Sequence, residues 1–128
     1  MTARPAALVF AGLTALVCAF HIALALGAPW GEFAMGGAFP GAYPPVMRVL
    51  ACIQIVALGL IALVVLCRAG LVLPRWSRYS RKLVWAIVAL LTAGFLLNLA
   101  TPSEGERLVW APVALALLLT SLRVATSR

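Results

Sequence analysis

The sequence predicts an all-α fold, a four-helix transmembrane bundle that forms a single domain over residues 1–128. The chain is 65% hydrophobic and only 10% charged, whereas ordinary soluble domains carry about 25% charged residues. Four apolar stretches fill most of its length, and each approaches the roughly 20 residues that a helix needs to cross a bilayer. The charged residues gather in the gaps between these stretches. A soluble enzyme this apolar would have no surface left to hydrate, so that class is excluded.

The first helix is expected over residues 5–27. Arg4 precedes it, as a basic residue precedes a secretory signal. Its apolar stretch is longer than the core of a typical signal peptide, so we predict a retained helix. Alanines recur at every fourth position from Ala7 to Ala23 and are followed by Gly27. Small residues on one helix face let a second membrane helix approach closely, and the stripe therefore predicts a packing seam.

The other three helices are expected over residues 45–68, 82–100 and 106–124. Residues 101–104 and 103–106 each offer a capping box, in which a hydroxyl residue is followed three positions later by an acid. Either register begins the fourth helix at this point.

The connection over residues 28–44 interleaves glycines and prolines with aromatic residues. Glycine and proline interrupt regular structure, and aromatic side chains suit a membrane interface. Loops of this length are often functional. We expect this one to fold on the bilayer surface or to dip back between the helices.

Charge predicts how the chain is oriented. Five basic residues and no acid occur between the second and third helices: Arg68, Arg75, Arg78, Arg81 and Lys82. Basic loops face the cytoplasm, so both termini are expected there, and the first and third connections face outward. We predict a multi-pass protein of a bacterial inner (plasma) membrane. The net charge of +7 is explained by orientation and by anionic lipids, and no nucleic-acid partner is expected.

Three polar side chains interrupt the apolar spans, namely His21, Gln54 and Asn98. The predicted orientation places all three in the outer half of the bilayer, on three different helices. Polar groups in lipid need partners, so we expect the three to converge. Two interpretations stay open: a polar pocket that binds a ligand or a lipid head group, or hydrogen bonds that only join the helices.

The long connection leaves the first helix just above His21, and its glycines would let it fold over the site as a lid. Glu32 is its only acid, held among aromatic residues. We therefore predict that Glu32 lines the same cavity, with Trp30 and Arg48 beside it. Glu104, Glu106 and Arg107 offer further charged groups on the same side.

Several site classes are not indicated. The sequence holds no nucleophile elbow, zinc-protease motif or phosphate-binding loop, and no catalytic residue is predicted. A zinc ion needs three or four convergent ligands, so the single histidine predicts no metal, and no cofactor is expected. The cysteines at positions 18, 52 and 67 all lie in apolar spans without a C-x-x-C pair, which argues against a disulfide framework or a redox motif.

A short pattern follows the first helix: Ala19-Phe20-His21 and then Ala25-Leu26-Gly27-Ala28-Pro29-Trp30-Gly31. It resembles a bacterial family of small four-helix membrane proteins of unknown function, with a histidine on the first helix, a Gly/Trp-Gly turn and a proline-containing loop. The similarity covers mainly residues 19–45. It implies a four-helix fold and transfers no activity.

These observations favour a non-enzymatic membrane protein, either an accessory subunit or a binder of a lipid or small apolar ligand. A small oligomeric transporter is the alternative, and a lipid-modifying enzyme that uses His21 and Glu32 is a more distant one. The expected partners are membrane lipids and either a second copy of the chain or another membrane protein.

Overall fold

A computed structural model describes residues 2–128 as a bundle of four long helices. They are α1 (Ala3–Ala25), α2 (Pro45–Arg68), α3 (Ser77–Ala100) and α4 (Glu104–Ala125). Each helix is long and apolar enough to cross a membrane, and the described residues contain no strand. The predicted fold class, an all-α bundle of four transmembrane helices, is therefore confirmed.

The helix ends follow local signals, and one differs from the prediction by more than two residues. Pro45 begins α2, where the missing amide hydrogen of proline costs nothing. Gly27 and Gly70 follow α1 and α2 with φ of +101° and +72°, which glycine adopts without strain. α3 begins at Ser77 instead of the predicted residue 82. The helix was predicted from its apolar stretch, and its first residues are too polar to belong to that stretch. They are helical nevertheless, because arginine and lysine are good helix formers.

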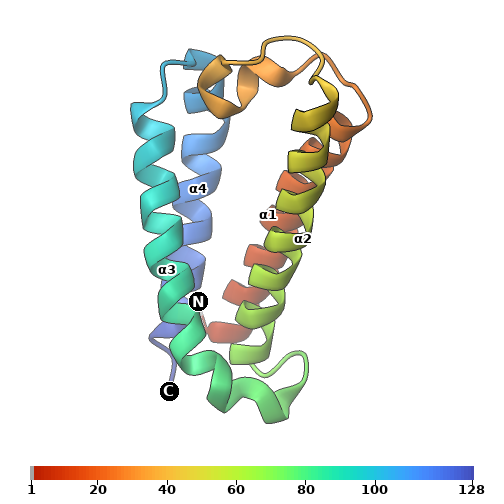
Figure 1. Cartoon of the computed structure of the whole chain (residues 1–128). Helices are drawn as coiled ribbons and strands as arrows, with labels where there is room; N and C mark the ends of the chain where they lie inside the picture. Colours follow the sequence, from red (N-terminus) through yellow and green to blue (C-terminus); the bar gives the residue numbers. More distant parts are fainter. Residues whose placement is uncertain (1) are drawn as a thin grey trace.

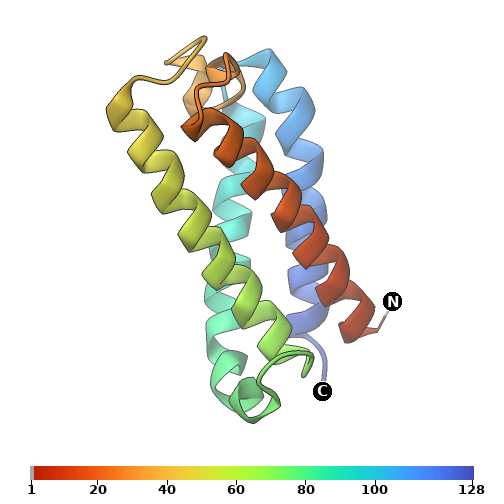
Figure 2. The same ribbon diagram turned by 90° about the vertical axis from the view of Figure 1, so that its right-hand side faces the viewer.

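The helices form two pairs that diverge toward one end. α1 packs along α2 and also against α4, and α3 packs along α4. Figures 1 and 2 both show α2 and α3 close together at one end and apart at the other. The closed end holds the start of α1, residues 69–76 and the C-terminus, and we call it the basic end. The open end, with residues 26–44 and 101–103, is called the loop end.

The packed core lies mostly at the basic end. All four helices contribute to it, with Ala6, Ala7, Phe10, Val65, Val84, Ile87, Leu117, Val124 and Ala125 as its buried members. A second cluster lies at the loop end and contains Leu24, Tyr43, Met47 and Ala51. Its buried members come only from α1, α2 and the residues just before α2. No buried cluster therefore joins the two helix pairs at the loop end.

The long connection is a folded cap on the loop end. It contains two short 3-10 turns, η1 (Gly31–Phe33) and η2 (Met35–Gly37). The Gly31 amide donates to the Gly41 carbonyl at 2.9 Å and closes the loop on itself. A Cβ atom at Gly31 would lie 1.8 Å from the Phe39 carbonyl oxygen, so only glycine fits there. The Ser103 hydroxyl donates to the Glu32 carbonyl at 2.6 Å and fastens the cap to the start of α4.

Arg68 fastens the basic end. Its side chain is only 8% exposed, and one guanidinium nitrogen donates to the Ser127 carbonyl at 2.6 Å. The Ser77 hydroxyl donates to the Arg68 carbonyl at 3.2 Å. The end of α2, the start of α3 and the C-terminal segment are thereby joined. Both termini lie at the same end as residues 69–76, as the predicted orientation requires; which side of the membrane that end faces stays a prediction.

The alanine stripe of α1 is not one continuous seam. Ala7 is buried, whereas Ala15 and Ala19 are exposed. The reason is helical geometry: a step of four residues overshoots one turn by about 40°, so a stripe at that spacing drifts around the helix. It begins in the basic-end core and emerges on the outside of the bundle by Ala15. The predicted packing seam is therefore right at Ala7 and wrong at Ala15 and Ala19.

Candidate functional site

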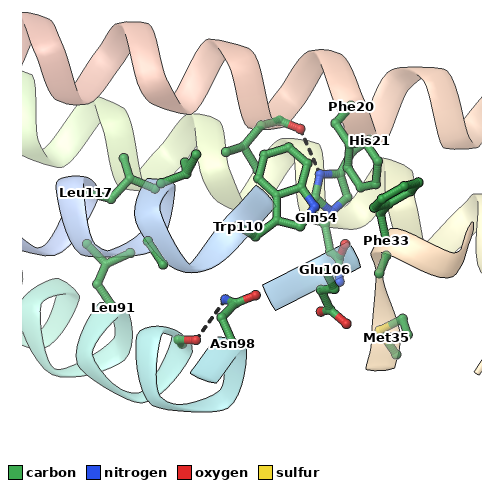
Figure 3. A pocket seen from close by; sticks show the side chains of 15 residues that line it. Phe20, His21, Phe33, Met35, Gln54, Leu91, Asn98, Glu106, Trp110 and Leu117 are labelled. Carbon is green, nitrogen blue, oxygen red and sulfur yellow. Dashed lines mark hydrogen bonds between the residues drawn. The ribbon is translucent and has the colours of Figure 1, made fainter. Parts of the chain in front are cut away.

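A cavity of about 270 Å³ lies between the helix pairs in the loop-end half of the bundle. All four helices contribute to its wall, and residues 33–35 of the cap close it toward the loop end. Figure 3 shows its side chains converging from α1 and α2 on one side and from α3 and α4 on the other. Leu91 and Leu117 mark its inner end, toward the basic-end core.

Small side chains explain why this space is not filled. Gly94 of α3 and Ala114 of α4 line the cavity. A Cβ atom added at Gly94 would meet nothing within 4 Å. Side chains that fill a core to normal density leave few voids larger than a water molecule. The helices thus leave a hollow at the level where the two packed clusters of the bundle do not meet.

The three polar residues predicted to converge do so. His21 from α1, Gln54 from α2 and Asn98 from α3 all line the cavity. Sequence reasoning placed them at a similar depth on different helices, and the bundle brings them to the same hollow. That they bind a ligand stays a prediction.

Each of the three side chains has at least one donor or acceptor without a partner among the described residues. His21 Nδ1 lies 2.9 Å from the Val17 carbonyl oxygen. A carbonyl only accepts, so Nδ1 is the donor of this bond, and Nε2 has no partner among the described residues. Asn98 Nδ2 donates to the Gly94 carbonyl at 2.9 Å, which leaves Oδ1 as an acceptor. The Gln54 amide makes no hydrogen bond to any of residues 2–128.

Trp110 of α4 is a site residue that sequence reasoning missed. Its ring lines the cavity and packs on Phe20, with the ring centroids 4.7 Å apart and tilted by 57°. Its indole nitrogen Nε1 is buried and has no hydrogen-bond partner among the described residues. This group can only donate. The overlooked signal was an indole N–H within an apolar span. Tryptophan is counted among the hydrophobic residues, although its ring carries this donor.

Glu106 takes the place that was predicted for Glu32. It lines the cavity from the first turn of α4. Its Oε2 accepts from the Gly36 amide and from the Thr101 hydroxyl, each at 2.8 Å. Its own backbone amide donates to the Ser103 hydroxyl at 3.2 Å, so the second of the two predicted capping registers is the one used. Glu106 thus joins the cap to α4 and places its carboxylate at the cavity.

The other three predicted site residues lie elsewhere. Glu32 is exposed and does not line the cavity, because its turn is held by its backbone carbonyl and not by its carboxylate. Arg48 Nε donates to the Tyr43 carbonyl at 2.8 Å, and its guanidinium packs against Gly27. Trp30 is half-exposed and lines a separate groove. The prediction that these side chains share a cavity with His21 is therefore wrong.

Glu106 acts on a neighbouring tyrosine. Among the described residues, it is the only charged one that lines the cavity. Tyr43 lies beneath the cap and is 4% exposed. Burial raises the pKa of Tyr43, and the Glu106 carboxylate raises it further. Both effects favour the neutral phenol.

The separate groove lies on the outside of the bundle between α1 and α4. It has a volume of about 550 Å³ and is lined by Leu16, Ala19, Phe20, Ala23, Trp30, Phe33, Val109 and Trp110. All of these side chains are apolar or aromatic. Phe20, Phe33 and Trp110 also line the inner cavity. The cavity and the groove are therefore divided by a wall that consists of these aromatic rings.

The chemistry available in the cavity is hydrogen bonding. Indole, imidazole and amide groups, together with one carboxylate, face a mostly apolar space. Within residues 2–128, no three histidine, cysteine or acidic side chains are placed to hold a metal ion. A neutral molecule with one or two oxygen atoms matches these groups.

Comparisons of the chain with known protein families, with curated proteins and with solved structures give no match. The resemblance of residues 19–45 to small four-helix membrane proteins therefore stays a prediction, and the function of the cavity has to be inferred from its own geometry.

Proposed function

We propose that this is a non-enzymatic protein of a bacterial inner membrane that binds a lipid or a small, largely apolar ligand in the loop-end cavity. One observation carries the proposal. Polar groups from all four helices converge on an apolar hollow, and two of them, Trp110 Nε1 and the Gln54 amide, have no partner among the described residues.

The energy of unpaired polar groups supports the proposal. A buried donor without a partner costs about 1–3 kcal/mol, and lipid offers no water to replace the missing bond. A ligand oxygen that accepts from the Trp110 indole N–H would remove this cost. The cavity is also large enough: an engineered apolar cavity of about 150 Å³ binds benzene, and this one measures about 270 Å³.

The shape of the bundle favours binding over transport. A transporter needs a path to both sides of the membrane, whereas the packed core at the basic end lies beneath the cavity. The basic residues at that end favour a cytoplasmic location, which makes the cavity outward-facing. A ligand would therefore be held in the outer half of the bilayer.

Trp110 offers a direct test. In a variant with Trp30, Trp76 and Trp85 changed to Phe, Trp110 is the only tryptophan. The probe is ortho-bromophenol, a neutral ring with one hydroxyl, whose bromine quenches indole fluorescence on contact. We expect saturable quenching in lipid nanodiscs. Gly94→Leu should abolish it, because the new side chain grows into the cavity.

The matched control is Gly59→Leu. Gly59 also has nothing within 4 Å of an added Cβ, but it does not line the cavity. Both changes replace a helix-interior glycine and should not weaken the fold, because glycine is about 1 kcal/mol less favourable than alanine there. Quenching that rises linearly with probe concentration, or equal quenching of the two variants, would refute the proposal.

A further inference from the structure

An aromatic wall separates the cavity from the groove, and the proposed function assigns it no role. Phe20, Phe33 and Trp110 face both hollows. Phe20 and Trp110 are in ring contact, at a centroid distance of 4.7 Å. Side chains occupy staggered rotamers, and we take a change of rotamer at one of these rings as the movement that joins the two hollows.

The groove has the character of a site for an apolar chain. Every side chain that lines it is apolar or aromatic. On its α1 side two lining residues, Ala19 and Ala23, are small and leave room for the groove. Trp30 lines it too and is 46% exposed. Tryptophan is the residue that membrane proteins place at the level of lipid head groups.

The cap makes a direct aqueous route to the cavity less favourable than a lateral one. Glu106 binds Gly36 of the cap, and Ser103 binds the Glu32 carbonyl. The Gly31–Gly41 hydrogen bond closes the loop itself. Access through the cap would break several of these bonds, whereas access from the groove breaks none of them.

Charge limits the head group of the ligand. Of residues 2–128, Glu106 is the only charged one that lines the cavity, and no lysine or arginine among them does. A carboxylate or phosphate would meet a negative charge in a low dielectric with nothing to compensate it. The groups with free capacity are one indole donor, two amides and two acceptors, namely the His21 ring and the second carboxylate oxygen of Glu106. They suit a hydroxyl or carbonyl oxygen.

We propose that the ligand is a neutral amphiphile with a hydroxyl- or carbonyl-bearing head and one apolar chain. The head occupies the cavity, the chain lies in the groove between α1 and α4, and access is lateral, from the bilayer past Phe20 and Trp110. This inference rests on the proposed function and specifies both the class of ligand and its route.

The test uses two probes in nanodiscs that carry the protein with Trp110 as its only tryptophan. One is ortho-bromophenol, and the other is the same molecule with a para dodecyl chain. Affinities are expressed per mole of bilayer lipid, so that partitioning of the chain into the membrane cancels. We expect the chain to increase affinity about tenfold, which corresponds to about 1.4 kcal/mol, because a tethered chain occupies the groove at high effective concentration.

Phenylalanine substitutions at two alanines one helical turn apart show where the apolar chain of the ligand lies. Ala19 lines the groove, whereas Ala15 lines neither hollow, and both are exposed. Ala19→Phe should remove the tenfold gain and leave binding of ortho-bromophenol unchanged. Ala15→Phe should leave both affinities unchanged. Since both side chains point away from the packed core, both variants are expected to fold.

The outcomes separate the two proposals. No saturable binding of ortho-bromophenol would refute the proposed function and this inference with it. Binding of ortho-bromophenol without a gain from the chain, or a gain that survives Ala19→Phe, would refute only the inference. A change of oligomeric state in Ala19→Phe would also refute it, since the groove would then be covered by a second copy of the chain.

Discussion

At the scale of single residues, one carboxylate links the cap, the fourth helix and the cavity. Glu106 accepts hydrogen bonds from Gly36 in the cap and from Thr101 before α4. Hydrogen bonds to a charged group are worth about 1.5–3 kcal/mol each. The same charge raises the pKa of Tyr43 beneath the cap. The state of the loop end can therefore be followed through a tyrosine.

The hydroxyl of Tyr43 should titrate above the ordinary range of a tyrosine. Its pKa is raised above the ordinary value near 10 by burial and by Glu106. On raising the pH, the unfolded chain loses this proton first, so stability is intact below about pH 10 and falls as the pH approaches the folded pKa. Tyr79→Phe leaves Tyr43 as the only tyrosine, and tyrosinate absorbance then reports it alone.

Glu106→Gln should move the midpoint of Tyr43 downward because the repelling charge is lost. An unchanged midpoint would show that Glu106 does not act on Tyr43. A midpoint at or below about pH 10 in the Tyr79→Phe protein would show that the Tyr43 hydroxyl is not buried.

At the scale of elements, α1 shows how a sequence repeat and a packing face differ. Its small residues recur every four positions, but the helix repeats every 3.6 residues. The stripe therefore begins in the core at Ala7 and reaches the lipid-facing surface at Ala15. Farther along, the same small side chains at Ala19 and Ala23 help to form the outer groove.

Leucine substitutions should destabilise the protein at the buried start of the alanine stripe and be tolerated where the stripe is exposed. Ala7 is 0% exposed, so Ala7→Leu overpacks the basic-end core, and overpacking typically costs about 1–3 kcal/mol. Ala15→Leu should be tolerated because Ala15 is exposed. Thermal unfolding in detergent measures both. Equal destabilisation would mean that Ala15 is covered by another chain.

The elements themselves were largely predictable, since long apolar stretches admit only helices in a bilayer. The start of α3 was not, because the apolar pattern ends where Arg81 and Lys82 begin, whereas the helix continues back to Ser77. The path of the cap was not predictable either. It depends on backbone angles such as the φ of +66° at Gly36, and composition does not encode the direction in which each side chain then points.

At the scale of the whole molecule, the basic end and the loop end should lie on opposite sides of the membrane. In a variant without its three native cysteines, Val72→Cys at the basic end should resist a membrane-impermeant thiol reagent in intact cells. Ala38→Cys in the cap should react. Both positions are exposed. The reverse labelling pattern would show that the cavity opens toward the cytoplasm.

The site was predictable in part, for a physical reason. His21, Gln54 and Asn98 are polar residues in apolar spans, and lipid forces such groups together, so their convergence followed from the sequence. Trp110 was missed because its large ring was counted as apolar, although the ring carries one hydrogen-bond donor. Glu106 was interpreted only as a helix cap, and the role in the cavity was assigned to Glu32. Which acid faces the cavity depends on how the cap docks on α4, and that is a property of the assembled bundle.

The uneven filling of the bundle also gives it an uneven mechanical response. Hydrostatic pressure favours states in which internal voids are eliminated. The basic end has a core shared by all four helices, whereas about 270 Å³ at the loop end is not filled by side chains. Compression is therefore taken up at the loop end, either by water that enters the hollow or by the helix pairs closing on it. The basic end of the bundle is therefore expected to be less compressible than the loop end.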